Sequence, residues 1–469
     1  MRSTAVAVDR AADSARNLAA YRLQLLLLLF IVPLFALTVS ACTPTAEANV
    51  VGYLITKRTN RLTAQYKGPT GTVTGFVQSD GKALSGATVL VAERNGSPHS
   101  AQTGDDGRYI IEQVPPGRYV PAAVAPGYEE ALLQGTQGIP QIVTVIANQQ
   151  TELATFELNP YHPPVLPANL ATATQLSIRH TAIVTAAFPP GAEAEVTAYE
   201  FTYAAAQVDT LRLYLPTNTE TRSLPLLYMI YPTAVDLWQS VSTAYAAEGF
   251  AVLAISPLPQ RGLDIDAHAT DAYVALSLAQ SGALGDRIAS SPAVALGGSF
   301  SSAVLHRFLR NYPRLPATAV GQSSGQTDGL RKGIAGWVTV GGIANAFQGT
   351  HEFYAGQITI PEEYTYLIPA LGAPNLYPLN FLRYSPVYTA AQLPPTLIIH
   401  TAADRIIPIE QAYELEAALR AADVPVDVFY YEDVSHYLQI DDQMTDAGRE
   451  MFYRVGDFAD RILREGIGR

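Results

Sequence analysis

The sequence predicts an α/β protein with a mostly parallel sheet, preceded by a small all-β sandwich domain. Between residue 71 and about residue 160, short β-branched runs alternate with turn signals such as SDGK, RNGS and PPGR. After about residue 195, short apolar runs alternate with helical patterns, as expected for βαβ units. Hydrophobic residues make up 48% of the 469 residues and charged residues only 15%, which excludes disorder as the main state.

The N-terminus carries the pattern of an export signal. Four arginines within residues 1–22 precede the apolar run LQLLLLLFIVPLFAL and the small-residue segment TVSAC. The end of this segment, Val39 to Cys42, resembles the bacterial lipobox, in which the cysteine thiol receives diacylglycerol. The resemblance implies a lipoprotein signal peptide at residues 1–41 and lipidation of Cys42, the single cysteine of the chain. An uncleaved signal anchor is the alternative, and either places the rest of the chain at the cell membrane, facing outside the cytoplasm.

The β-rich region follows a linker at residues 42–69 and extends over residues 70–159. Its pattern GTVTGFVQSDGKALSGATVLV, followed by TGDDGRYIIEQVPPGRYVPAAVAPGY, resembles the carboxypeptidase regulatory-like domains, which are transthyretin-like β-sandwiches. We favour a spacer role for this domain over a surface that contacts carbohydrate or protein. The proline-dense segment NPYHPPVLPAN begins a second linker, assigned to residues 160–194.

Residues 195–469 form the predicted α/β domain. The runs DTLRLYLP, LPLLYMIYP, FAVLAISP and AVALGG are expected strands, and HATDAYVALSLAQSGAL is an expected helix. Ligands of such sheets bind at the carboxyl ends of the strands, so catalytic residues are expected there.

A nucleophile elbow is predicted at the end of the run AVALGG. Gly297 and Gly298 precede Ser299, and a helical pattern follows until Pro313. Glycines allow the sharp turn that projects a serine hydroxyl, and the helix N-terminus favours developing negative charge. This stretch resembles the α/β-hydrolase family, although Ser301 stands where G-x-S-x-G has its last glycine. A plain helix N-cap is the alternative role for Ser299.

A complete G-x-S-x-G motif surrounds Ser323, in GQSSG. The preceding run ATAV is short, and the following QTDGLRKG has no amphipathic pattern. Ser299 is therefore the preferred nucleophile.

The acid and the base of a catalytic triad follow the serine in α/β-hydrolases. Asp404 lies in the loop after the expected strand TLIIHT, and His436 lies in EDVSHYL after the expected strand VDVFYY. The stretch resembles the D-x-x-V-P…H ending of dienelactone hydrolase-like and prolyl oligopeptidase-like enzymes, with Thr401 where many members have glycine. Asp433 is the rival acid, but it is only three residues from His436 and is less able to approach the imidazole Nδ1.

The resemblance implies an oxyanion hole formed by the backbone N–H groups of Phe300 and Thr233, because Pro232 has no N–H group. The tyrosine-rich segment 344–385 interrupts the α/β pattern and is predicted to form a cap over an acyl or alcohol pocket. A structural insertion that packs on the sheet is the alternative. His351 and Glu352 in this segment are adjacent and point different ways, so we expect no metal there.

These features predict an exported, lipid-anchored serine hydrolase that cleaves carboxylic esters through an acyl-enzyme intermediate. A peptidase or an acyltransferase could use the same triad, and a catalytically silent cell-surface binding protein is the alternative from another class. No cofactor and no metal are expected. The expected partners are a small-molecule or polymer-borne ester and the membrane through Cys42, whereas the net charge of −12 argues against nucleic acid.

Overall fold

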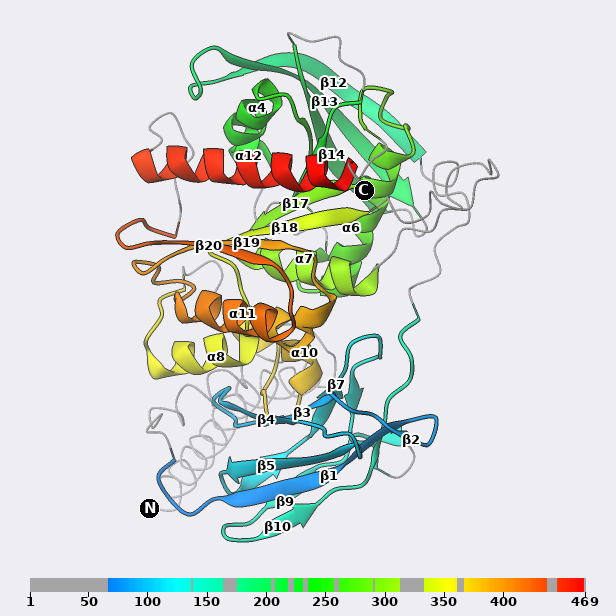
Figure 1. The fold of residues 1–469 in the computed structure, drawn as a ribbon, viewed down its shortest axis with the longest axis vertical. Helices are drawn as coiled ribbons and strands as arrows, with labels where there is room; N and C mark the ends of the chain where they lie inside the picture. Colours follow the sequence, from blue (N-terminus) through cyan, green and yellow to red (C-terminus); the bar gives the residue numbers. More distant parts are fainter. Residues whose placement is uncertain are drawn as a thin grey trace, which may run out of the picture.

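The structure, a computed structural model, describes most of the chain from residue 66 onward. The described residues are 66–135, 138–162, 175–203, 207–217, 223–230, 235–256, 261–289, 292–312, 333–360, 367–436 and 445–467. Cys42, Thr233 and Ser323 therefore lie outside the described residues. A β-rich region occupies one end of the molecule, and a large sheet with helices on both faces occupies the other (Figure 1).

The N-terminal β-rich region, called the sandwich below, is built from short strands. They are β1 (Gly71–Ser79), β2 (Lys82–Ala83), β3 (Thr88–Ala92), β4 (Pro98–Gln102), β5 (Arg108–Val114), β6 (Gly117–Tyr119), β7 (Ala122–Val124), β8 (Ala131–Leu132), β9 (Val143–Val145), β10 (Gln150–Glu152) and β11 (Phe156–Glu157). In β5, buried Tyr109 and Ile111 alternate with exposed neighbours, as expected for a strand with one face in a core. These side chains pack with Val73 of the neighbouring strand β1 and with Val89 of β3, which belongs to another sheet, so the sandwich has a core of its own.

The second region contains a nine-stranded sheet. Its strands are β12 (Gln175–Ala186), β13 (Ala192–Tyr203), β14 (Gln207–Pro216), β15 (Leu226–Ile230), β16 (Ala251–Ile255), β17 (Ala293–Gly298), β18 (Ile334–Val340), β19 (Thr396–Thr401) and β20 (Val426–Tyr431). The order across the sheet is β12-β13-β14-β16-β15-β17-β18-β19-β20. The pairs from β12 to β16 are antiparallel, and all pairs from β16 to β20 are parallel. The predicted α/β fold with a mostly parallel sheet, preceded by a β-rich domain, is confirmed.

The sheet begins earlier in the chain than predicted. Residues 175–194, assigned to the linker from the sequence, form β12 and the start of β13. β12 lies at the edge of the sheet, and its register shifts between Ile178 and His180. Most of its residues are exposed, so it lacks the apolar alternation that marks a half-buried strand.

Helices α4 (Gln239–Ala247), α6 (Ile265–Gln280), α7 (Phe300–Asn311), α11 (Glu410–Ala421) and α12 (Asp446–Ile467) cover the two faces of this sheet (Figure 1). The region also contains α8 (Ala346–Ala355), α9 (Leu367–Ala370) and α10 (Pro378–Leu382), with 3-10 turns at Val235–Trp238 and Pro386–Gln392. One apolar cluster joins α4 and α12 to one face, and a second joins α6, α7 and α11 to the other. Strands β15 and β16 are buried along their whole length because both of their faces are covered. No helix in the described part of the chain is both long and apolar enough to span a bilayer.

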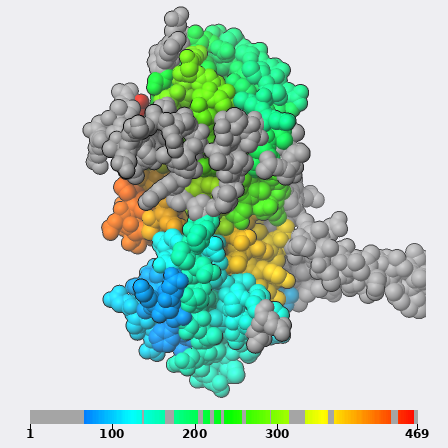
Figure 2. All heavy atoms as spheres, turned by 90° about the vertical axis from the view of Figure 1, so that its right-hand side faces the viewer, coloured from blue at the N-terminus to red at the C-terminus, as the bar shows by residue number. Residues whose placement is uncertain are grey.

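The segment between β18 and β19, called the cap below, carries helices α8, α9 and α10. Phe347 of α8 and Phe381 of α10 pack against Leu90 and Val124 of the sandwich. In the space-filling view, cyan atoms of the sandwich lie directly against the gold atoms of the cap (Figure 2). The cap therefore lies between the sandwich and the rest of the α/β region.

Candidate active site

Ser299 stands at the turn between β17 and α7. Its backbone has φ 52° and ψ −127°, a region that L-residues rarely adopt and that is typical of strained functional turns. A Cβ atom on Gly297 would lie 2.8 Å from Leu305 Cδ1, and one on Gly298 would lie 2.8 Å from the Val340 carbonyl oxygen. The added atom on Gly297 would also lie 3.0 Å from the Ser301 carbonyl oxygen, so close backbone groups favour glycine at both positions. Ser301 is accommodated inside α7, where it is buried.

Three side chains from distant parts of the sequence meet at this turn. Ser299 Oγ lies 3.1 Å from His436 Nε2, and His436 Nδ1 lies 2.6 Å from Asp404 Oδ2. With Nδ1–H donating to the carboxylate, Nε2 is left to accept the serine proton. Asp404 follows β19 and His436 follows β20, so both come from the carboxyl ends of adjacent parallel strands.

The carboxylate of Asp404 is fixed from two sides. Its Oδ1 accepts hydrogen bonds from the backbone N–H groups of Ile406 at 2.8 Å and Ile407 at 2.9 Å, which leaves Oδ2 for the imidazole. The Asp404 side chain is fully buried. Asp433, the rival acid, is exposed and is not the carboxylate beside Nδ1.

Two further residues of β19 support this arrangement; Thr401 was noted in the sequence only as a departure from the family pattern, and His400 was not singled out. Thr401 Oγ1 donates to the Val434 carbonyl oxygen at 2.7 Å and so ties the aspartate strand to the histidine loop. His400 Nε2 donates to the Ile407 carbonyl oxygen at 2.8 Å and lies 3.6 Å from Asp404 Oδ2. Burial lowers the pKa of His400 and so disfavours the charged imidazolium at this position. The only sequence signal was their position next to Asp404.

One of the two expected oxyanion donors is described. Phe300 is the first residue of α7, so its N–H group has no acceptor within the helix and lies at the positive end of the helix dipole. Thr233 lies outside the described residues.

An apolar pocket adjoins the serine. It has a volume of about 120 Å³, and its apolar lining includes Leu263, Phe300, Ile343, Ile358, Ile368 and Ile407. The Ile343 N–H donates to the Ser299 carbonyl oxygen at 3.3 Å, which places this wall beside Ser299. None of the described residues that line the pocket is charged. The pocket can hold an uncharged apolar group next to Ser299.

The adjacent pair His351 and Glu352 lies on α8. Gln348 Nε2 donates to Glu352 Oε1 at 3.1 Å, and burial raises the pKa of the Glu352 carboxyl. Within the described ranges, no three His, Cys, Asp or Glu side chains come together as a metal site would require.

Two parts of the chain match known family models. Residues 71–159 match the carboxypeptidase regulatory-like domain, and residues 346–464 match the prolyl oligopeptidase family. The second match includes both Asp404 and His436. The search of curated proteins returns no match to this chain.

Several solved esterases resemble the chain in structure. Esterase B from Lactobacillus rhamnosis is 13% identical, with a TM-score of 0.43 over 55% of this chain and 82% of that chain. An esterase from the Planctomycetes species Thermogutta terrifontis is 14% identical, with a TM-score of 0.41 over 55% of this chain and 91% of that chain. A carbohydrate esterase from gut microbiota is 17% identical, with a TM-score of 0.41 over 54% of this chain and 90% of that chain.

Proposed function

We propose that this serine hydrolase, which has an α/β-hydrolase fold, cleaves carboxylic esters through an acyl-enzyme intermediate. One observation carries the proposal: Ser299, His436 and Asp404 form a continuous hydrogen-bonded chain at a strained strand-to-helix turn. We assign Ser299 as nucleophile, His436 as general base and acid, and Asp404 as the group that fixes the imidazole tautomer.

In acylation, Ser299 Oγ bonds to the ester carbonyl carbon while its proton passes to His436 Nε2. The bond from that carbon to the alcohol oxygen then breaks, and the same proton moves from Nε2 to the leaving alcohol. In deacylation, water attacks the acyl carbon and gives a proton to Nε2. That proton returns to Ser299 Oγ as the carboxylic acid leaves.

The negative charge on the carbonyl oxygen needs donors that are already in place. The Phe300 N–H group at the start of α7 supplies one, and we propose the Thr233 N–H group as the second. Loss of one such donor costs about 3 kcal/mol of transition-state stabilisation.

The pocket beside Ser299 supports an ester with an apolar acyl group, because its lining offers apolar contacts and no charge to bind an ionic group. A peptidase is the second candidate, since residues 346–464 match the prolyl oligopeptidase family. The same triad would then attack an amide carbonyl.

The location of the enzyme is also proposed. The basic N-terminus, the apolar run and the lipobox-like segment ending at Cys42 support export and lipidation, with the catalytic domain held at the outer face of the cytoplasmic membrane.

Labelling of the full chain with a fluorophosphonate tests the nucleophile. We expect covalent labelling of the wild type and none of Ser299→Ala, whereas Ser281→Ala, at the far end of α6, labels normally. Undiminished labelling of Ser299→Ala would move the nucleophile elsewhere, with Ser323 the first alternative to check.

A matched set of p-nitrophenyl esters, p-nitroanilides and peptides then distinguishes the two activities. We expect ester turnover to exceed amide and peptide turnover. Faster cleavage of peptides than of esters would support the peptidase instead.

A further inference from the structure

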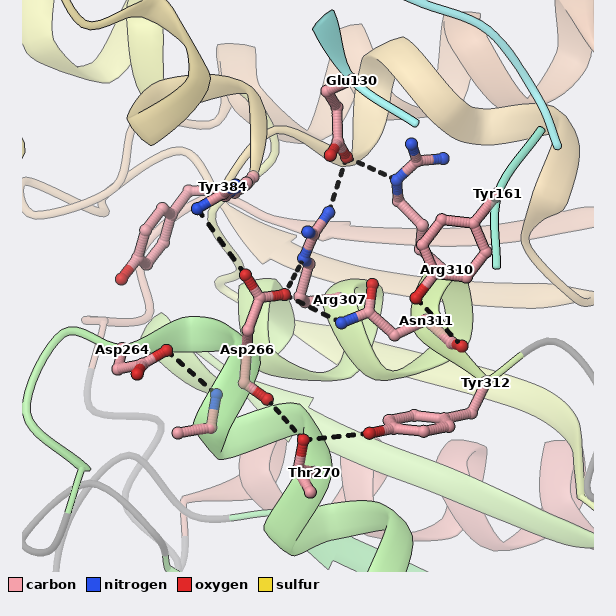
Figure 3. Close-up of polar contacts among 12 residues, drawn as sticks. Glu130, Tyr161, Asp264, Asp266, Thr270, Arg307, Arg310, Asn311, Tyr312 and Tyr384 are labelled. Atoms are coloured by element: carbon pink, nitrogen blue, oxygen red, sulfur yellow. Dashed lines mark hydrogen bonds and ion pairs between the residues drawn. The ribbon is translucent and has the colours of Figure 1, made fainter. Parts of the chain in front are cut away.

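A buried ion cluster joins the sandwich to helix α7. Glu130 of the sandwich uses one carboxylate oxygen, Oε1, to accept hydrogen bonds from Arg307 Nη1 at 2.6 Å and from Arg310 Nε at 2.5 Å (Figure 3). The three side chains are only 8%, 5% and 1% exposed, respectively. Both arginines lie on the helix whose first turn follows Ser299.

The cluster has further polar partners. Arg307 Nε also donates to Asp266 Oδ1 of α6 at 2.5 Å, and Arg383 Nη1 lies 3.7 Å from Asp266 Oδ2, so two carboxylates face three guanidinium groups. Arg310 Nη2 donates to the Tyr128 carbonyl oxygen of the sandwich at 2.6 Å. Burial opposes ionisation of Glu130, but Arg307 and Arg310 outweigh it and lower the pKa of its carboxyl to about 2. The carboxylate therefore keeps its charge throughout the neutral pH range.

A second contact joins the sandwich to the cap. Leu90 and Val124 pack against Phe347 of α8 and Phe381 of α10. The turn at Gly96 also approaches α8 so closely that a Cβ atom there would lie 2.6 Å from the Phe347 carbonyl oxygen and 2.7 Å from the backbone nitrogen of His351.

Helix α8 also lines the pocket. Ala346, Gly349 and Thr350 are among the lining residues, and Ala346 also packs against the apolar contact with the sandwich. Leu371 of the cap likewise belongs to both. A single layer of cap residues thus separates the sandwich from the pocket beside Ser299.

We propose that the sandwich is a positioning module for the active site: Glu130 docks it on the nucleophile helix, and the docked sandwich holds α8 so that the pocket keeps the shape that accepts an apolar acyl group. Glu130 is then a positioning residue that acts through Arg307, Arg310 and α8. The inference rests on the proposed function because it names the substrate group that the pocket selects. It replaces the spacer role favoured from the sequence.

The test compares two alkyl fluorophosphonates, one with an ethyl and one with an octyl chain, on the full chain. The measured quantity is the ratio of their second-order labelling rates. We expect the ratio of the octyl rate to the ethyl rate to be about tenfold lower in Glu130→Gln than in the wild type. A change of this size corresponds to losing the burial of roughly two methylene groups. The rate with the ethyl probe should change much less. Glu129→Gln is the matched control, because Glu129 is the exposed neighbour of Glu130, and it should keep the wild-type ratio.

A second pair of variants covers the case in which Glu130→Gln does not fold. Gly96→Ala disturbs the approach to α8, whereas Gly81→Ala adds a methyl group at another positive-φ turn with nothing within 4 Å. We expect Gly96→Ala to lose the preference for the octyl probe and Gly81→Ala to keep it.

The outcomes separate the two proposals. Wild type that labels with neither probe contradicts the proposed function. Wild type that prefers the octyl probe, with folded Glu130→Gln or Gly96→Ala keeping that preference, overturns the positioning role alone. Labelling rates of the variants that fall equally with both probes also overturn the positioning role, because a general loss of structure would give that result.

Discussion

Ser299 is held in its strained backbone conformation by hydrogen bonds on both sides. Its N–H group donates to the Val340 carbonyl oxygen at 3.0 Å, and its carbonyl oxygen accepts from the Ile343 N–H group at 3.3 Å. A conformation of this kind costs about 1–3 kcal/mol and persists only where the surroundings enforce it. The strand β18 beside the serine thus keeps the hydroxyl pointing at the imidazole.

His306 gives a pH dependence of stability that can be measured. It lies on α7, where burial, reinforced by the charges of Arg307 and Arg310 and opposed by Glu130, lowers its pKa to about 3. As the pH falls, His306 is therefore protonated in the unfolded chain first, at a pH near 6.5. The contribution of His306 to the free energy of unfolding is fully present above pH 6.5. It falls as the pH drops towards 3, by at most about 1.4 kcal/mol per pH unit.

Urea unfolding at pH 7, 6 and 5 checks this expectation. His306→Gln should show a shallower decline than the wild type, whereas His162→Gln, at an exposed position, should not. Equal slopes for wild type and His306→Gln would show that His306 does not titrate in this way.

Sequence reasoning found the residues whose positions are set by local motifs. The glycine pair before Ser299, and the strand ends before Asp404 and His436, are visible in the chain itself. The partners of Glu130 could not be found in this way, because Arg307 and Arg310 are 177 and 180 residues away in the sequence. Only the docking of the sandwich brings them together.

The turn from β17 to α7 is the element on which the site depends. Its backbone passes so close to Leu305 and Val340 that side chains at Gly297 and Gly298 have no room. The helix that follows is buried along its length, so it cannot shift easily to make room.

Gly297→Ala tests this requirement. We expect it to destabilise the fold by about 1–3 kcal/mol through overpacking, and to lower the rate of fluorophosphonate labelling by about 100-fold through displacement of Ser299. Gly456→Ala is the contrasting variant, because Gly456 lies inside α12 with nothing within 4 Å. It should stabilise the protein by about 0.5–1 kcal/mol and leave labelling unchanged. Thermal unfolding and labelling rates measure both, and a fully active Gly297→Ala would show that the turn can open.

The elements of the parallel sheet were easier to predict than its edge. β15 and β16 are continuous apolar runs because helices cover both of their faces. β12 has no such signal, since its side chains are mostly exposed and its stability comes from pairing with β13. The linker was therefore predicted too long.

At the scale of the whole molecule, the sandwich and the α/β region are joined by charge and by apolar packing. The apolar contact of Leu90 and Val124 with Phe347 and Phe381 would be exposed to water if the two parts came apart, so the two parts should resist separation.

The proposed anchor adds a prediction about the complete protein. In a bacterial host with lipoprotein processing, the wild type should fractionate with membranes and incorporate labelled palmitate. Cys42→Ala should lose the palmitate label, because no other thiol is present. Palmitate on Cys42→Ala would contradict lipidation at this residue, and an unlabelled wild type that stays in the membrane would indicate an uncleaved signal anchor instead.

The irregular pairing of β12 also bears on solubility. A 12-residue edge strand with Ile178 and Ile183 63% and 60% exposed could recruit strands from other molecules into a growing aggregate. The register shift between Ile178 and His180 interrupts the regular row of free donors and acceptors that such recruitment requires. We therefore expect this register shift to oppose aggregation when many copies of the protein lie close together on one surface.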